Sequence, residues 1–170
     1  VKIVWIDSKR DAIDNITEKL EAIVKEYQPK LKNTKIGYVI RKGKVAQEIV
    51  AQAKEDKAEL IVLGTHGVSG LNEKKIWSNA LKIVQDASCP VLVIREDFNF
   101  DKKLEKILLP IDSSESTRQK VPFAANMAKI FGSEVDILGL YTSKMDSIRK
   151  AVNRYVTQSK EFLTSEGVPY

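Results

Sequence analysis

The sequence predicts an α/β protein with a doubly wound, open parallel sheet, a Rossmann-like α/β/α arrangement. Three observations carry this prediction. Short apolar runs recur along the chain, segments with helical periodicity separate them, and Gly, Pro or capping residues mark many of the junctions. Alternation of strand and helix is typical of parallel sheets covered by helices on both faces. The apolar runs are uninterrupted, which indicates strands buried on both sides.

The first half of the chain alternates four expected strands with three expected helices. The strands are predicted at Lys2–Ile6, Ile36–Ile40, Leu60–Leu63 and Pro90–Ile94. Each helix carries its apolar side chains on one face, and the helices are predicted at Asp11–Tyr27, Val45–Ala53 and Ser78–Asp86. In the third helix the predicted inward positions are Ala80, Leu81 and Val84.

The second half repeats the alternation after a charged, irregular stretch at 96–105 that reads as a linker. Strands are predicted at Ile107–Ile111 and Val135–Leu140, and a helix at Met145–Leu163. Between the two strands, Asp112-Ser113-Ser114 is expected to cap a helix that ends at Gly132. The apolar face of that helix comprises Val121, Ala124, Ala125, Ala128 and Ile130. Gly167-Val168-Pro169 is expected to lead into a further strand that is cut off.

Composition narrows the class of protein. The 170 residues allow one domain or parts of two, and since the first residue is Val1 and not Met we expect a fragment. The net charge of +5 is spread over many lysines with few aromatics between them, which argues against nucleic-acid binding. The single cysteine, Cys89, suits a reducing compartment, and no apolar run reaches the length of a membrane span. A cytoplasmic protein with no membrane partner is therefore expected.

The segment Gly64-Thr65-His66-Gly67-Val68-Ser69-Gly70 directly follows the predicted strand Leu60–Leu63. Glycines after a buried strand let the backbone approach an anion, and a following helix N-terminus adds positive partial charge. Gly70 is followed by Leu71 and not by Lys, so the segment is not a Walker A loop. His66 is the only histidine, and the turn itself explains it better than a catalytic role does.

Two segments together resemble the universal stress protein family. Ala58–Gly67, Ser78-Asn79 and Cys89–Ile94 are similar to the closing half of the family's domain, and Ile107–Ser116 through Ala128 to its opening half. Because the closing half comes first, the resemblance implies a tandem protein. Residues 1–95 would form a first domain lacking its first strand and helix, 96–105 a linker and 106–170 the start of a second domain. A permuted single domain, with the strand at Ile107 filling the gap in the first sheet, is the alternative.

The resemblance also implies nucleotide-contacting positions. These are Leu63, Gly64, Gly67, Ser78, Asn79, Pro110 and Asp112. Family members that bind ATP carry Gly-x2-Gly-x9-Gly followed by Ser or Thr, and here Trp77 stands in place of the third glycine. An indole there would fill the space of the phosphates, so loss of nucleotide binding in the first domain is expected. On the alternative interpretation, Gly64 and Gly67 only shape a turn and Ser78 only caps its helix.

In the second domain, the resemblance gives Asp112 a hydrogen bond from an adenine amino group, with Pro110 and Ile111 lining the base pocket. Capping of the following helix by Asp112 or a neighbouring serine is the alternative. Cys89 is expected to be a small buried residue and not a nucleophile.

The predicted function is a stress-response binding or regulatory module that acts through dimer or partner contacts. By resemblance, the strand Pro90–Ile94 pairs with its counterpart in a homodimer or in a second domain of the same chain. The alternative is an adenine-nucleotide-binding stress protein with slow or no hydrolysis, and ATP with Mg²⁺ is the one cofactor that this reading implies. No catalytic constellation or metal motif is visible, so an enzyme of the related nucleotide-binding class is the weaker third reading.

Overall fold

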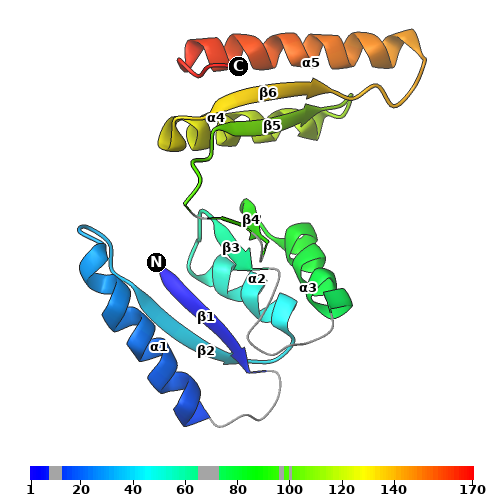
Figure 1. Ribbon diagram of the computed structural model, residues 1–170. Coiled ribbons are helices and arrows are strands. Elements are labelled where there is room, and N and C mark those ends of the chain that lie inside the picture. The colour runs from blue at the N-terminus through cyan, green and yellow to red at the C-terminus, as the bar shows by residue number, and fades with distance from the viewer. Residues whose placement is uncertain (8–12, 65–72, 96–97, 100) are drawn as a thin grey trace. The chain divides into compact units, whose positions relative to one another are not determined.

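The computed structural model describes residues 1–7, 13–64, 73–95, 98–99 and 101–170, with backbone only at 13–14 and 73–77. The chain forms two compact units, Val1–Phe98 and Asn99–Tyr170. Figure 1 shows the strands and helices of each unit. The first is called unit 1 and the second unit 2.

Unit 1 contains two pairs of parallel strands. β1 (Lys2–Asp7) pairs with β2 (Gly37–Lys42), and β3 (Ile61–Gly64) pairs with β4 (Val91–Ile94). Its helices are α1 (Ile13–Tyr27), a 3-10 turn at Gln28–Lys30, α2 (Val45–Glu55) and α3 (Glu73–Asp86). Within the described residues no ladder joins one pair to the other, so the sheet of unit 1 consists of two separate halves.

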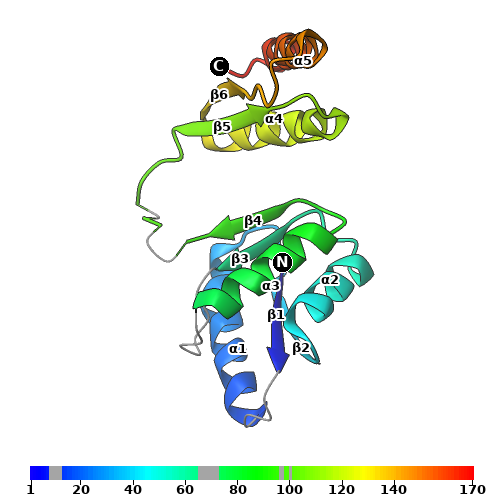
Figure 2. The ribbon, with the colours of Figure 1, turned by 90° about the vertical axis from the view of Figure 1, so that its right-hand side faces the viewer.

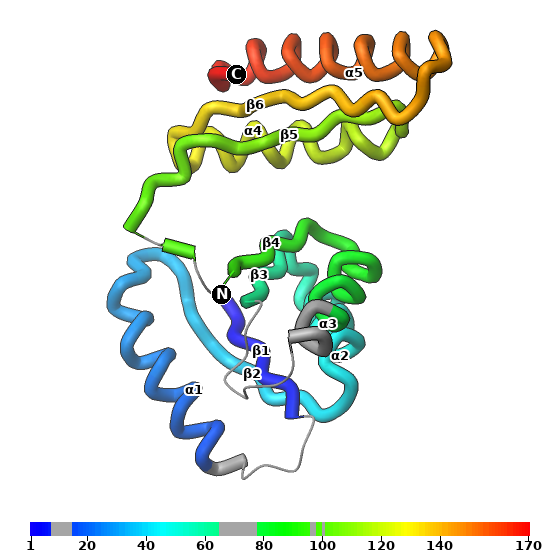
Figure 3. Tube along the Cα trace, turned by 45° about the vertical axis from the view of Figure 1, so that its right-hand side comes forward, coloured from blue at the N-terminus to red at the C-terminus, as the bar shows by residue number. Residues whose placement is uncertain are grey.

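The helices of unit 1 lie on different sides of these strand pairs. α1 packs against β2, whereas α2 packs against β1 and against α3. Figures 1 and 3 agree in placing α1 and α2 on opposite sides of the β1–β2 pair. Figure 2 shows α3 lying over the β3–β4 pair beside α2. The α2–α3 side carries the apolar core of unit 1, in which Ala46, Ile61 and Ile83 are buried.

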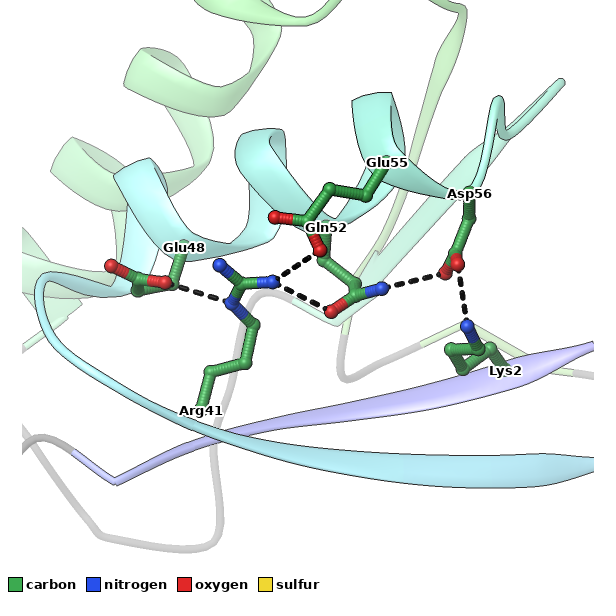
Figure 4. A network of polar contacts seen from close by, with 6 residues as sticks. All are labelled: Lys2, Arg41, Glu48, Gln52, Glu55 and Asp56. Carbon is green, nitrogen blue, oxygen red and sulfur yellow. Dashed lines mark hydrogen bonds and ion pairs between the residues drawn. The ribbon is translucent and has the colours of Figure 1, made fainter.

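A chain of polar contacts ties α2 to both strands of the first pair (Figure 4). The Arg41 guanidinium at the end of β2 donates to Glu48 Oε2 at 2.8 Å, to Gln52 Oε1 at 2.8 Å and to Glu55 Oε2 at 2.7 Å. Glu48, Gln52 and Glu55 recur at helical spacing, so one stripe of α2 faces Arg41. Because three acceptors surround it, the pKa of Arg41 is raised, chiefly by Glu55 and then by Glu48.

The chain of contacts continues to β1. Gln52 is only 6% exposed, and its amide donates to Asp56 Oδ2 at 2.9 Å while its carbonyl oxygen accepts from Arg41. Asp56 also accepts a bond from the Lys2 ammonium in β1. Both ends of the buried Gln52 side chain are therefore satisfied, which avoids the cost of burying an unpaired amide. β1, β2 and α2 are joined through this one network.

Gly43 shapes the turn between β2 and α2. Its φ is +148°, and an added Cβ would lie 2.7 Å from Glu48 Oε1. Glycine therefore leaves the space in which the Glu48 carboxylate folds back toward Arg41.

Unit 2 contains one parallel pair and two helices. β5 (Lys106–Ile111) pairs with β6 (Glu134–Gly139), and a 3-10 turn at Glu115–Gln119 leads into α4 (Lys120–Phe131). α5 (Asp146–Ser165) follows β6. The core joins the same face of both strands to both helices, through Leu109, Ile111, Val135, Val121, Ala124, Ala125, Ala128, Tyr155 and Leu163.

The predicted α/β class with parallel strands is confirmed, and unit 2 repeats the strand–helix–strand–helix order as a second partial repeat. The order of strands and helices also agrees with prediction, apart from shifted boundaries. Residues 167–170 follow α5 without forming a strand, and Val135 N–H of β6 donates to Pro169 O at 2.9 Å.

Burial differs from prediction at several positions. Val62 and Leu108 lie in strands yet are 55% and 62% exposed, because the helices cover one face of the β3–β4 and β5–β6 pairs. In α3, Ala80 is buried as predicted, but Leu81 and Val84 are exposed, and Ile83 takes the core position instead. Ile130 of α4 is exposed as well. The four other predicted residues of the α4 face are buried.

Gly132 ends α4 in the left-handed region, with φ +68°, and its N–H donates to Ala128 O. We expect Gly132→Ala to destabilise unit 2 by about 1 kcal/mol, because a Cβ is strained at this φ. Amide hydrogen exchange of the slowest amides in unit 2 should then be roughly fivefold faster. Gly37→Ala is the matched control, since Gly37 has no atom within 4 Å of an added Cβ and no positive φ. Equal effects of both substitutions would show that the left-handed backbone at Gly132 is not the cause.

The Asp56 carboxylate gives unit 1 a pH-dependent component of stability. Hydrogen bonds from Lys2 and then from Gln52 lower its pKa below the ordinary 3.8. The unfolded chain therefore binds the proton more readily, and this component is complete above the ordinary value and lost as pH falls through the lowered one. We expect wild type to exceed Asp56→Asn in urea midpoint at about pH 6, and the difference to shrink at about pH 3.

Tryptophan fluorescence can follow this unfolding, since Trp5 lies in β1. Glu59→Gln serves as the control, because Glu59 is exposed and forms no ion pair with another described residue. A difference in urea midpoint between wild type and Asp56→Asn that stays constant with pH would show that the lowered pKa of Asp56 does not contribute to the stability of unit 1.

Candidate functional site

Parallel α/β sheets place ligands at the carboxyl ends of their strands, so the candidate site in unit 1 begins there. β3 ends at the exposed Gly64, whose partner in the ladder is Ile94 at the end of β4. In the other pair, Asp7 and Lys42 stand opposite each other at the last register position. Gly67 and His66 fall at 65–72, outside the described residues.

Ser78 lies at a different position in its helix than the sequence predicts. α3 begins at Glu73 and not at Ser78, so Ser78 lies in the second turn of the helix. The backbone N–H groups of a second turn bond to carbonyls of the first turn and do not point out of the helix end. The predicted role of Ser78 as a cap, or as a phosphate contact at the helix N-terminus, therefore does not match this helix.

The neighbours of Ser78 share this helix. Asn79 is half-buried in α3, and Ser78 is exposed. Trp77 also belongs to α3 by its backbone, but its side chain lies outside the described residues. The departure from the family's glycine pattern thus sits on a helix and not in a loop.

Leu63 and Cys89 belong to the apolar core of unit 1. Both are half-buried and pack against the cluster of Ala46, Ile61 and Ile83. Cys89 packs against the core as predicted for a small apolar residue, but it is half-buried and not fully buried. Since the Leu63 side chain turns into the core, a ligand at this strand end would meet its backbone and that of Gly64.

In unit 2, Asp112 follows the last residue of β5 and organises a tight turn. Its Oδ1 accepts from the Ser114 backbone N–H at 2.9 Å and from the Ser114 hydroxyl at 2.6 Å. Ser114 precedes the 3-10 turn without a side-chain cap bond to it. Asp112 thus fixes the residues ahead of that turn and does not cap the helix itself, which differs from both forms of the capping interpretation.

Thr117 secures the same turn from below. Thr117 is buried. Its hydroxyl accepts a hydrogen bond from Asp112 N–H at 3.2 Å and donates one to Pro110 O at 3.4 Å. Its hydroxyl therefore links the end of β5 to the 3-10 turn. Sequence reasoning missed Thr117, and the only local signal is a hydroxyl among polar residues seven positions after Pro110.

The turn keeps the Asp112 carboxylate anionic. Its pKa is lowered from the ordinary 3.8, first by the Ser114 hydroxyl and then by the Ser114 backbone N–H. Asp112 is half-buried, and its Oδ2 has no hydrogen-bond partner in the part of the chain that the structure describes.

The side chains of Pro110 and Ile111 lie on opposite faces of β5. Ile111 is fully buried in the core beneath α4 and α5, so it does not line a pocket at the strand end as the resemblance implied. Pro110 is half-buried on the opposite face of β5, beside Leu138 in the ladder.

Comparison with known proteins agrees with the α/β fold. The universal stress protein family model matches residues 5–95, more than half of the chain. The chain belongs to the universal stress protein family. The matched region covers nearly all of unit 1.

Individual members of the family are similar over shorter segments. The chain is 45% identical over 53 residues to universal stress protein YxiE of Bacillus subtilis and 42% identical over 62 residues to universal stress protein MJ0531 of Methanocaldococcus jannaschii. These segments make up 31% and 36% of this chain. It is also 37% identical over 57 residues, 34% of this chain, to the universal stress protein in the QAH/OAS sulfhydrylase 3' region of Thermus aquaticus. The matches span 36%, 36% and 42% of those relatives' lengths.

The described residues lack two further features. No helix among them is long and apolar enough to span a bilayer. No group of three or more His, Cys, Asp or Glu side chains gathers among them in a way that suits a metal ion.

Ser114 gives a direct test of the Asp112 turn. We expect Ser114→Ala to raise the pKa of Asp112 toward 3.8, because the hydroxyl is the largest cause of its lowering. An NMR titration of the Asp112 carboxyl carbon measures this. Ser113→Ala is the matched control, since the neighbouring Ser113 makes no hydrogen bond with a described residue. An unchanged pKa in Ser114→Ala would contradict the geometry.

Proposed function

We propose that this universal stress protein is a stress-response binding module that acts through strand-edge contacts of β4 with a second copy or a second domain. The observation that carries the proposal is the outer edge of β4. This strand pairs only with β3 among the described residues, and its sequence Val91–Ile94 has no charged side chain.

The hydrogen-bonding groups on that edge follow from the ladder. Ile61 N–H donates to Pro90 O at 3.0 Å, so Pro90 and Leu92 direct their backbone groups toward β3. The alternate residues Val91 and Val93 direct theirs outward. An apolar edge with free backbone groups is a ready template for another strand, and proteins that keep such an edge exposed usually blunt it with charge. Here the outward-facing residues Val91 and Val93 carry no charge.

Val93→Pro tests this edge without touching the β3 ladder, because the lost N–H points outward. We expect wild type to self-associate and Val93→Pro to weaken association roughly tenfold or more. Sedimentation equilibrium measures both dissociation constants. Wild-type chain that stays monomeric up to about 1 mM would rule out self-association through β4.

Val93→Ala is the matched control, since it shortens the side chain at the same position but keeps the N–H. It should associate within a few-fold of wild type. If Val93→Ala weakens association as strongly as Val93→Pro, side-chain packing holds the contact and strand pairing does not.

Adenine-nucleotide binding is the second candidate function. Two observations favour it: the exposed Gly64 ends β3 without a side chain, and Asp112 presents one unpaired carboxylate oxygen at the end of β5. ATP with Mg²⁺ is the ligand to test. No catalytic step is part of this proposal.

Trp77 decides between the two functions for unit 1. We expect calorimetric titration of the wild-type chain with ATP and Mg²⁺ to show no saturable heat from unit 1 at sub-millimolar ATP. Trp77→Ala removes the indole while keeping a good helix former, and Trp77→Gly restores the family residue at a cost of about 1 kcal/mol in helix propensity.

If the indole blocks the phosphates, both variants gain binding. If the phosphates must also come close to the backbone at position 77, only Trp77→Gly gains ATP binding. Wild type that binds ATP with an unchanged constant in both variants would remove Trp77 as an obstacle.

A further inference from the structure

Tyr155 of α5 combines a buried ring with a hydroxyl that lacks an acceptor. The residue is 5% exposed and belongs to the apolar core of unit 2. Its hydroxyl accepts one long hydrogen bond, from Arg154 Nη2 at 3.5 Å, and donates none to the residues that the structure describes. Buried tyrosine hydroxyls usually find a partner for their proton, so this donor calls for an explanation.

Two guanidinium groups lie over the same ring. The guanidinium carbon of Arg118, in the 3-10 turn at Glu115–Gln119, is 4.7 Å from the ring centroid of Tyr155, and that of Arg154 is 5.1 Å from it. The two guanidinium carbons are therefore no more than about 10 Å apart. A cation–π contact holds a guanidinium in place without using its N–H donors, so these donors stay available at the edges of both groups.

Neither arginine has a carboxylate partner within the described part of the chain. Two lysines of unit 2 differ, since Lys106 forms ion pairs with Glu134 and Asp136 at 3.7 and 3.4 Å, and Lys129 with Glu166. The 3-10 turn and α5, which carry the two arginines, also hold acidic residues that form no ion pair with a described residue: Glu115, Asp146 and Glu161.

The surrounding structure holds both arginines at the ring. Arg118 follows the buried Thr117, whose hydroxyl ties the 3-10 turn to the end of β5. Arg154 precedes Tyr155 in α5, and the ring of Tyr155 is fixed by the core between α4, α5 and the strands. Groups that are already in place lose little conformational entropy when a ligand binds, which favours binding at this position.

We propose that Arg118, Arg154 and the hydroxyl of Tyr155 bind a phosphate monoester. All three are donors, and none has found an acceptor of charge opposite to the arginines among the described residues. Both arginines are exposed, so an anion can reach them from solvent. The site lies in unit 2, on the side of β5 and β6 that α4 and α5 cover, and is therefore separate from both functions proposed for unit 1.

The chemistry of the donors favours a phosphoryl group over a carboxylate. A carboxylate has two oxygens in one plane, which a single guanidinium fork can occupy. A phosphoryl group carries roughly −1.5 to −2 charge at about pH 7 and three acceptor oxygens, so it can serve two guanidinium groups and a hydroxyl together. With charge-assisted bonds of about 2.8 Å on each side, one such group spans the separation of the two arginines.

A second arginine–tyrosine contact of α5 offers a control within the same unit. Arg149 lies 5.6 Å from the ring centroid of Tyr141, and it is the one guanidinium recorded over that ring among the described residues. The Tyr141 hydroxyl donates to Asn153 Oδ1, so its proton has an acceptor. This contact has the same chemistry as the proposed site but lacks the second arginine and the unused donor.

The test is an NMR titration of the 170-residue chain with methyl phosphate at about pH 7, read at the guanidinium signals of the arginines. Sodium chloride keeps the ionic strength constant, because salt screens exposed charges. We expect the signals of Arg118 and Arg154 to shift together and to saturate with one dissociation constant of about 1 mM, while Arg149 stays unchanged. Acetate should bind at least roughly tenfold more weakly.

A capped peptide with one phosphoserine between alanines identifies the source of the monoester. A constant equal to that of methyl phosphate would assign the site to small phosphate monoesters, and at least roughly tenfold tighter binding of the peptide would assign it to a phosphorylated protein. Nucleotide and Mg²⁺ are left out, so a negative result is distinct from failure of the ATP titration of unit 1.

Four substitutions, each checked for an unchanged urea midpoint, separate the site from a generally basic surface. Arg118→Gln and Arg154→Gln should each weaken binding of methyl phosphate roughly tenfold, the usual effect of losing one charge-assisted hydrogen bond. Tyr155→Phe keeps the ring and removes only the O–H, and should weaken binding roughly threefold or more. Arg149→Gln is the matched control, with the same loss of charge, and should leave the constant unchanged.

Two results would overturn the proposal. One is a set of shifts that rise equally at Arg118, Arg149 and Arg154 without saturating. The other is an effect of Arg149→Gln as large as that of Arg118→Gln, which would show general attraction of anions to a basic surface. An unchanged constant in Tyr155→Phe would overturn the part assigned to the hydroxyl.

Discussion

Helix α2 is the element on which unit 1 depends, because two different interactions meet on it. Its polar stripe, Glu48, Gln52 and Glu55, surrounds the guanidinium of Arg41, and the contacts run on through Asp56 to Lys2. Its apolar stripe, Ala46, Ile49, Val50 and Ala53, packs against β3, α3 and β4. No strand ladder joins the two halves of the sheet among the described residues, so the orientation of one half relative to the other rests on this helix. A polar network of this kind is stable only when each buried member has a partner, and Gln52 has one at each end.

The candidate sites lie where these packed elements stop. In unit 1 the carboxyl ends of the strands carry Gly64, Asp7 and Lys42, and in unit 2 the carboxyl end of β5 carries Asp112. Asp112 shows how a family position acquires its chemistry from its surroundings. Ser114 occupies one carboxylate oxygen and lowers the pKa, while Thr117 locks the turn, so the second oxygen is held in place as an acceptor.

The two proposed functions make different demands on the same fold. Strand-edge contact needs only an apolar edge with outward backbone groups, which β4 has. Nucleotide binding needs several groups to converge at one strand end, and the residues that family resemblance assigns to it are divided between the two units, with Ser78 inside a helix. Membership of the universal stress protein family, with the match at residues 5–95, is compatible with either function.

The order and type of the strands and helices could be predicted from the sequence, as could the family, because apolar periodicity and short motifs are properties of neighbouring residues. The end of α4 at Gly132 and the core positions of that helix are of the same kind. Burial could not be predicted in this way: Val62, Leu81 and Leu108 are as apolar as Ile61, Ile83 and Leu109, yet only the second three are buried. The Arg41 network and the partners of Asp112 also depend on which elements meet. The sequence by itself determined the strands, the helices and the family. Tertiary packing decided which faces are covered and which polar groups find partners, since both depend on contacts between residues far apart in the chain.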